Sequence, residues 1–79
     1  MTAKIFVTLK QGVLDPQGQA VQRALGRLGF QEVQEARIGK FIELRLDGTP
    51  AEARARVEKM CEELLANTVV EDYRYELSD

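Results

Sequence analysis

Both prolines of this 79-residue chain directly follow a residue that is well suited to begin a helix. Proline lacks a backbone N–H and favours the first helical position, while the preceding Asp15 or Thr49 can accept a hydrogen bond from the first free amides. The second start also has Glu52 three residues after Thr49, which is the spacing of a capping box. These signals predict one helix over residues 16–28 and a second over residues 50–66.

Each predicted helix carries an apolar stripe at helical spacing. The stripes consist of Ala20, Val21, Ala24, Leu25 and Leu28 in the first helix, and of Val57, Met60, Cys61, Leu64 and Leu65 in the second. Gly29 suits the left-handed residue that often follows the end of a helix. Both helices are therefore expected to bury one side against another element.

Four further segments have the composition of strands. Residues 4–10 and 41–47 alternate between apolar and polar side chains, which is typical of a strand with one buried face. Residues 33–38 form a strand that Gly39-Lys40 joins to 41–47, because glycine at the first of two turn residues favours a type II′ hairpin. Residues 68–77 are rich in β-branched and aromatic side chains and are predicted to form the last strand.

The resulting order, βαββαβ, predicts an α+β fold. It matches the ferredoxin-like, split βαβ pattern of a two-layer sandwich, in which an antiparallel four-stranded sheet carries two helices on one face. No internal linker or low-complexity segment interrupts the order. Residues 1–79 are therefore expected to form a single domain.

This fold leaves the second face of the sheet without a helix. The alternation places Phe6, Phe41, Glu43 and Arg45 on that face. Two phenylalanine side chains among charged ones are more typical of a subunit contact than of a solvated surface. We therefore predict that these four residues mediate self-association, and the sequence leaves open whether a homodimer or a tetramer results.

Charge and composition exclude several classes of partner. The 11 Lys and Arg residues against 13 Asp and Glu give a net charge of -2, which supplies no excess of cations for nucleic acid. No apolar run approaches the roughly 18 residues needed to span a bilayer, so we expect no membrane association. A single cysteine cannot form an intrachain disulfide, and the cytoplasm is the expected location.

The chain offers no recognisable site for catalysis, a cofactor or a metal ion. It contains no histidine, which removes the usual general base and the commonest metal ligand. Cys61 is in register with Val57 and Leu64, which predicts a buried thiol without an activating base. Adjacent carboxylates such as Glu62 and Glu63 diverge on a helix and do not converge on a substrate. We expect no catalytic residue, cofactor or metal ion in this chain.

Three segments carry a recognisable combination of motifs. They are residues 13–18 (VLDPQG) with Ala20 and Val21, residues 33–40 (VQEARIGK) with Glu43 and Leu44, and residues 60–62 (MCE) with residues 64–73 (LLANTVVEDY). In order, spacing and total length the chain resembles the PurS family, the small subunit of the bacterial and archaeal phosphoribosylformylglycinamidine (FGAM) synthase complex of purine biosynthesis.

The resemblance implies a noncatalytic role in a ligase complex. In the family's complex a glutaminase subunit, PurQ, releases ammonia from glutamine, and a synthetase subunit, PurL, uses ATP and Mg to join it to formylglycinamide ribonucleotide (FGAR). PurS-like chains bridge these two partners and assist the transfer of ammonia, which benefits from docking that shields it from bulk water. The resemblance therefore implies that this subunit needs no cofactor of its own.

The residues that contact such partners are predicted separately. Our candidates are the charged side chains of Arg37, Lys40, Glu71, Asp72 and Arg74. The alternative for the same five residues is a solvated charged rim without a binding role.

Two other functions are alternatives to a synthase subunit. The first is a stand-alone regulatory domain of ferredoxin-like shape that binds a small effector between subunits. The second is a small hydrolase of acylphosphatase-like shape, which requires an anion-binding loop after the first strand. Residues 10–15 fit that loop poorly, because only Lys10 is cationic and Asp15 opposes it.

Overall fold

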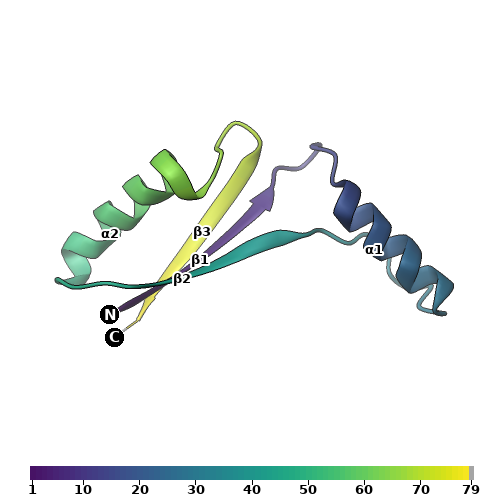
Figure 1. Ribbon diagram of the computed structural model, residues 1–79, viewed down its shortest axis with the longest axis horizontal. Coiled ribbons are helices and arrows are strands. Elements are labelled where there is room, and N and C mark those ends of the chain that lie inside the picture. Colours follow the sequence, from purple (N-terminus) through teal and green to yellow (C-terminus); the bar gives the residue numbers. More distant parts are fainter. Residues whose placement is uncertain (79) are drawn as a thin grey trace.

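The computed structural model describes residues 1–78, in which three strands and two helices alternate along the chain (Figure 1). The strands are β1 (Thr2–Leu9), β2 (Gly39–Arg45) and β3 (Glu71–Ser78), and the helices are α1 (Pro16–Arg27) and α2 (Pro50–Met60). A single wider π turn, η1 (Cys61–Leu65), continues α2 and closes with a 3.0 Å hydrogen bond from the Ala66 amide to the Cys61 carbonyl. The predicted α+β class and the two helices are confirmed.

Both helices begin where the capping residues predict. Asp15 Oδ1 accepts a hydrogen bond from the Gly18 amide over 2.8 Å, and Pro16 occupies the first turn of α1. Thr49 Oγ1 accepts one from the Glu52 amide over 3.3 Å at the start of α2. These bonds satisfy amides that have no partner within the helix itself.

β1 is the central strand of the sheet, and both neighbours run antiparallel to it in the order β2-β1-β3. The register places Ile5 between Ile42 and Tyr75, on the face that we call the inner face. Phe6, the next residue, points to the opposite face, which we call the outer face. The predicted placement of Phe6, Phe41, Glu43 and Arg45 on one face is confirmed by this register.

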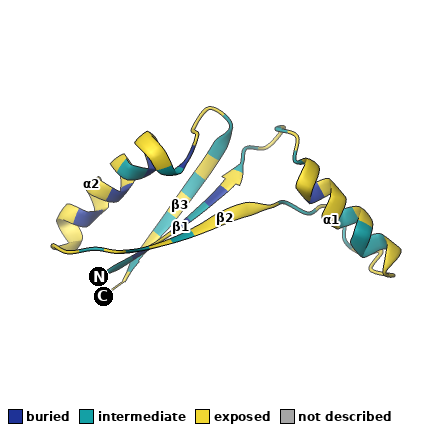
Figure 2. Cartoon of the chain, in the orientation of Figure 1, coloured by how far each residue is buried: buried dark blue, intermediate teal, exposed yellow. Residues whose placement is uncertain are grey.

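The core lies between the inner face and α2. Ile5 and Val7 of β1 are almost completely buried, and they belong to one cluster with Val57 and Cys61. Figure 2 shows buried positions on both β1 and α2 in dark blue. Removing such apolar surface from water is the main favourable contribution to folding. On the same face, the side chains of β2 are only half-buried, because α2 does not cover them fully.

The sheet has three strands, and the predicted fourth strand over residues 33–38 is wrong. This segment makes no strand pairing and runs beside α1, where Gln22 Nε2 donates a hydrogen bond to the Gln34 carbonyl over 2.9 Å. The ferredoxin-like arrangement of four strands is therefore not formed within residues 1–78. The prediction failed because the composition of a strand does not say which neighbour the strand will have.

The predicted hairpin at Gly39 and Lys40 is also wrong. Both residues belong to β2, where they pair with Thr8 and Val7 of β1. A type II′ turn requires a positive φ at its first central residue, and Gly39 does not adopt one. The glycine has another role here, because a Cβ atom at this position would collide with the Val7 carbonyl oxygen.

The third correction concerns α1, which does not lie on the sheet. Residues 10–38, which we call the arm, project from the end of β1 on the side away from α2 (Figure 1). The molecule measures 48 × 26 × 14 Å and its radius of gyration is 15.9 Å. A compact domain of this length has a radius of gyration of about 12 Å. Gly18 is the only buried residue of α1. The prediction of two helices on one face of the sheet is therefore wrong, because only α2 lies on that face within residues 1–78.

Two glycines of α1 form a matched pair for testing how the arm is held together. A methyl group at Gly18 would collide with the Ala36 carbonyl oxygen, whereas one at Gly26 would lie 4.0 Å from its nearest neighbour, Gln31 Nε2. We expect Gly18→Ala to cost about 1–3 kcal/mol through overpacking. Gly26→Ala should stabilise the chain by about 0.5–1 kcal/mol, because alanine favours the helix.

Urea unfolding measures both effects, and hydrogen exchange locates them. Gly18→Ala should speed the exchange of amides in residues 30–38, and Gly26→Ala should not. Equal changes in the two variants would contradict this account of the arm.

Candidate interaction surface

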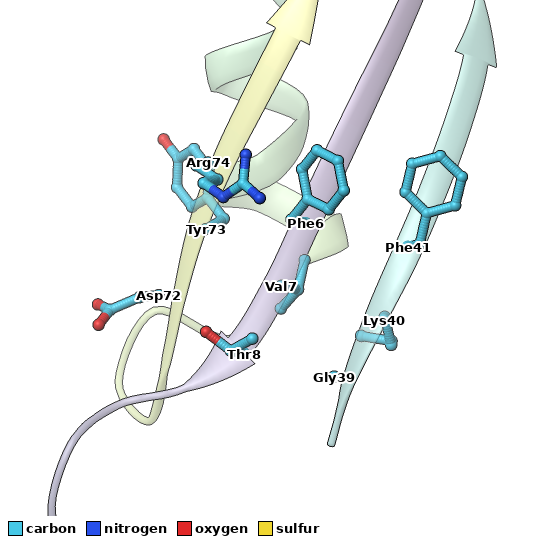
Figure 3. A pocket seen from close by; sticks show the side chains of 9 residues that line it. All are labelled: Phe6, Val7, Thr8, Gly39, Lys40, Phe41, Asp72, Tyr73 and Arg74. Carbon is cyan, nitrogen blue, oxygen red and sulfur yellow. The ribbon is translucent and has the colours of Figure 1, made fainter. Parts of the chain in front are cut away.

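A row of three large side chains crosses the outer face. Phe6 lies between Phe41 and Arg74 in the register of the sheet. The two rings are 5.2 Å apart between centroids and tilted by 34°, and the Arg74 guanidinium carbon lies 4.0 Å from the centre of the Phe6 ring (Figure 3). A cation over an aromatic face is attracted by the ring quadrupole. The row is thus one contiguous surface of mixed aromatic and cationic character.

A shallow hollow of about 390 Å³ adjoins this row. Its lining includes Phe6, Thr8, Gly39, Phe41 and Asp72 (Figure 3). Gly39 contributes no side chain, so the hollow opens where β2 begins. Phe41 is 56% exposed, so a large apolar side chain faces water here.

The remaining predicted residues of the outer face flank the row. Glu43 lies opposite Lys4, and Arg45 lies opposite Thr2. The structure therefore brings together all four residues that the sequence predicts for self-association, on one uncovered face. The stacking of Arg74 on Phe6 escaped the sequence analysis, because it depends on which strands are neighbours.

The five charged candidates for partner contacts do not form one patch. Asp72 and Arg74 are on the outer face, with side chains 67% exposed, and they form ion pairs with Lys10 and Glu76, respectively, over 3.8 Å. Lys40 and Glu71 have the opposite parity, so they emerge toward the inner face.

The two side chains that face inward form hydrogen bonds with backbone groups near η1. Lys40 Nζ donates to the Leu65 carbonyl over 3.3 Å. Glu71 Oε1 accepts from the Asn67 amide over 2.7 Å. Both side chains thereby tie the η1 region to the ends of strands, a function that the sequence analysis did not predict.

The fifth candidate, Arg37, lies at the base of the arm. Its guanidinium donates hydrogen bonds to the carbonyls of Leu9 and Lys10, where β1 ends. It also forms an ion pair with Glu35 over 3.6 Å. Its side chain is only 24% exposed. Arg37 therefore connects residues 30–38, which we call the return segment of the arm, to the end of β1.

Asp15 closes the same base from the other side. Its second carboxylate oxygen, Oδ2, accepts a hydrogen bond from the Ile38 amide over 2.9 Å, in addition to the helix cap at Gly18. These two bonds, with Ile38 making the larger contribution, lower the pKa of the Asp15 carboxyl below its ordinary value. One side chain thus joins the residue that enters α1 to the residue that enters β2.

Cys61 and Tyr75, two side chains with perturbed pKa values, lie where α2 packs on the inner face. Cys61 is completely buried, and this burial, together with the nearby Glu62 and Glu58, raises the pKa of its thiol. Tyr75 donates its hydroxyl to Glu58 over 2.8 Å, and this bond raises the pKa of the tyrosine. Over residues 1–78, no three Cys, Asp or Glu side chains are grouped to hold a metal ion.

No helix in the same part of the chain is long and apolar enough to cross a membrane.

Comparison with known proteins decides the family. The family model PurS, described as phosphoribosylformylglycinamidine (FGAM) synthase, matches residues 2–79. The synthase subunit PurS of Bacillus subtilis is 53% identical over 76 residues, which are 96% of this chain and 90% of that protein. The subunit PurS of Synechocystis is 51% identical and covers 95% of this chain and 76% of that protein. The chain belongs to the PurS family.

Solved structures agree with this assignment to the PurS family. The structure of Bacillus subtilis PurS matches with a TM-score of 0.89 at 51% identity, covering 99% of this chain and 98% of that one. A chain of the structure of PurLQS from Thermotoga maritima matches with a TM-score of 0.81 at 34% identity, covering 96% of both chains. Because these likenesses cover nearly the whole chain, they include the projecting arm. The resemblance drawn from the sequence is confirmed.

The Asp15 carboxylate allows a pH test of the arm base in this PurS-family chain. A carboxyl whose pKa is lowered on folding contributes stability above its unfolded pKa of about 3.9, and this stability is lost as the pH falls through the folded pKa. The free energy of unfolding of Asp15→Asn should therefore lie below that of the unsubstituted chain at neutral pH. This difference should shrink as the pH falls below about 4.

Urea unfolding at a series of pH values measures the difference. Asp47→Asn is the matched control, because that exposed carboxylate accepts no backbone hydrogen bond in the described structure. A gap between Asp15→Asn and the unsubstituted chain that stays constant from pH 7 to acid would argue against the two charge-assisted bonds.

Proposed function

We propose that this chain is the noncatalytic small subunit of FGAM synthase, and that it bridges a PurL-like synthetase and a PurQ-like glutaminase. Its role there is to assist the transfer of ammonia from the glutaminase to the synthetase, which converts FGAR to FGAM with ATP. The single observation that carries the proposal is the likeness to a chain of PurLQS over 96% of this chain. The match to the PurS family model over residues 2–79 supports the same role.

The chemistry of the side chains fits a partner without an active site. The only thiol is buried, its pKa is raised, and the chain contains no histidine to activate it. We therefore propose that ATP and Mg are bound by the synthetase and that this subunit takes up no cofactor. The cytoplasmic location expected from the sequence stays a prediction.

Contact with the two partner subunits needs exposed groups at fixed positions. We propose that Asp72 and Arg74 provide them, because both project from the outer face of β3, an edge strand. Lys40 and Glu71 remain candidates at the ends of the edge strands. Arg37 is a weaker candidate, since its guanidinium is directed at the carbonyls of Leu9 and Lys10.

The outer face also supports self-association. Phe6 and Phe41 offer an apolar centre, and Glu43 and Arg45 offer opposite charges on the same strand. A two-fold contact sets the same patch on both copies, so Glu43 of one copy can meet Arg45 of the next. We propose that these four residues form a contact between two copies of the chain.

The bridging role predicts a defined pattern of activities in reconstitution. Purified PurL-like and PurQ-like subunits from the same organism are assayed with and without this chain for FGAM formation, with either glutamine or ammonium as nitrogen donor. We expect this chain alone to show no turnover. Omitting it should abolish most glutamine-dependent synthesis while ammonium-dependent synthesis by the synthetase persists, because only the former needs transfer between subunits.

If omitting this chain reduced FGAM synthesis equally with glutamine and with ammonium, the proposal that it assists ammonia transfer would be refuted. Full glutamine-dependent activity without this chain would refute the bridging role altogether. Isothermal titration of the chain with amino acids and nucleotides tests the alternative of an effector-binding domain, which predicts saturable heat in the absence of both partners.

The outer-face contact predicts that Phe41→Lys weakens self-association. A lysine in place of the 56% exposed ring adds a charge at the centre of the patch and should raise the dissociation constant at least about tenfold. Leu64→Lys is the control, because Leu64 is 82% exposed on η1, away from this face. Light scattering or native mass spectrometry measures the mass, and an unchanged assembly in Phe41→Lys would rule out this contact.

A further inference from the structure

We propose that residues 62–69, which we call the tip, dock this chain onto a partner subunit whose surface offers an apolar hollow rimmed by lysine or arginine. The tip joins α2 to β3 at the end of the sheet where β3 begins (Figure 1). Leu64 and Val69 are the apolar anchors of this contact, and Glu62 meets the basic rim. The contact rests on the proposed role in FGAM synthase, since it supplies one of the two partner interactions of that role.

The tip carries the two most exposed large apolar side chains of residues 1–78. Leu64 and Val69 are each 82% exposed, compared with 56% for Phe41 on the outer face. Between them in the chain, Leu65 packs against the core and Ala66 is buried, so the tip is anchored at its middle. Single exposed apolar side chains are common on protein surfaces, and the geometry of η1 and of the turn after it distinguishes these two.

The π turn of η1 is what leaves Leu64 in water. The buried stripe of α2 runs through Ala53, Val57 and Cys61, at the spacing of an α-helix. Continued as an α-helix, this stripe reaches Leu64, three residues after Cys61. The wider turn adds one residue, so Leu65 takes that place at the core and Leu64 is turned outward. Such single wide turns are frequent at functional sites.

Hydrogen bonds hold the second half of the tip in one conformation. The Asn67 carbonyl accepts hydrogen bonds from the amides of Val70 and Glu71 over 3.0 and 2.8 Å. The Asn67 side-chain oxygen accepts one from the Val69 amide over 3.2 Å. The bonds made by the side chains of Lys40 and Glu71 fasten this turn to the ends of the strands. A surface that is ordered before binding loses little conformational entropy in the complex, so the tip is suited to recognition.

The charge around the tip is negative on balance. Its four carboxylates outnumber the three ammonium groups beside them; the carboxylates are those of Glu62, Glu63, Glu71 and Asp72, and the ammonium groups those of Lys10, Lys40 and Lys59. Lys59 pairs with Glu63 over 4.0 Å, and Lys10 pairs with Asp72 over 3.8 Å. Glu62 is exposed and forms no ion pair within residues 1–78. The complementary surface of a partner is therefore basic.

A second copy of this chain is a poor occupant for the tip. Two acidic tips that face each other across a two-fold axis repel. Each also offers projecting side chains, Leu64 and Val69, and not a hollow to receive them. The occupant is therefore a different subunit.

Titration of the reconstituted synthase tests the contact. Glutamine-dependent FGAM formation by PurL-like and PurQ-like subunits of the same organism is measured against the concentration of this chain. Leu64→Lys should raise the half-saturating concentration at least about tenfold, because it replaces an apolar anchor with a charge that a basic rim repels. Leu64→Glu should raise it less, since a carboxylate is compatible with that rim. Val69→Lys should act in the same direction as Leu64→Lys.

Ala51→Lys is the matched control. Ala51 is exposed in the first turn of α2, at the opposite end of the helix from the tip, and the substitution adds the same charge. We expect its half-saturating concentration to equal that of the unsubstituted chain. Circular dichroism and urea unfolding check that each variant remains folded, and Val69→Lys keeps the test decisive if Leu64→Lys unfolds.

Photochemical cross-linking shows directly what the tip contacts. Thr68→Cys places a thiol at an exposed position beside Val69, and benzophenone maleimide labels it. We expect the labelled chain to form a covalent product with one partner subunit of the assembled synthase. The unsubstituted chain reports any labelling of the buried Cys61.

Several outcomes would overturn the proposal. One is a half-saturating concentration that is the same for Leu64→Lys as for Ala51→Lys. Another is an equal effect of Leu64→Lys and Leu64→Glu, because the rim would then not be basic. A third is cross-linking from Thr68→Cys to a second copy of this chain only. If the unsubstituted chain gave no activation at any concentration, the proposed role in FGAM synthase would itself fail, so the two failures are distinguishable.

Discussion

The carboxylate of Asp15 joins the two ends of the arm at the point where the arm leaves the sheet. One oxygen accepts the Gly18 amide and begins α1, and the other accepts the Ile38 amide immediately before β2. Arg37 adds hydrogen bonds to the carbonyls of Leu9 and Lys10, so both strands that flank the arm are connected to its base. With this base closed, α1 is directed away from the inner face, and the extended shape of the molecule follows. Within residues 1–78, α2 is then the helix that covers the core on the inner face.

Two uncovered surfaces result, and they lie on opposite sides of the sheet. The outer face presents the row of Phe41, Phe6 and Arg74, and the inner face presents a groove beside α2. The buried core is small, and most side chains of residues 1–78 remain at or near the surface.

Much of the local structure could be predicted because it depends on short-range chemistry. Asp15-Pro16 and Thr49-Pro50 begin helices as expected, and the alternation along β1 and β2 places Ile5 inside and Phe6 outside. The four residues of the outer face were predicted together for the same reason. The prediction of a hairpin at Gly39 failed because glycine is compatible both with a turn and with a close approach between strands. The contact with the Val7 carbonyl, which shows the close approach, is visible only in the tertiary structure. The five charged candidates do not share one surface. Lys40 and Glu71 point toward the inner face, whereas Asp72 and Arg74 point toward the outer face.

The amino-acid sequence by itself determined the two helix starts, the inner and outer faces of the strands, the absence of histidine and the resemblance to the PurS family. Each of these depends on neighbours within a few residues or on residues that are simply absent. The tertiary structure alone decided that residues 33–38 accompany α1 instead of joining the sheet, and that α1 projects from the domain. These outcomes depend on contacts between residues more than 20 positions apart, such as Asp15 with Ile38 and Arg37 with Leu9. A local pattern of hydrophobic residues shows that a helix has a face to bury, but not what will cover that face.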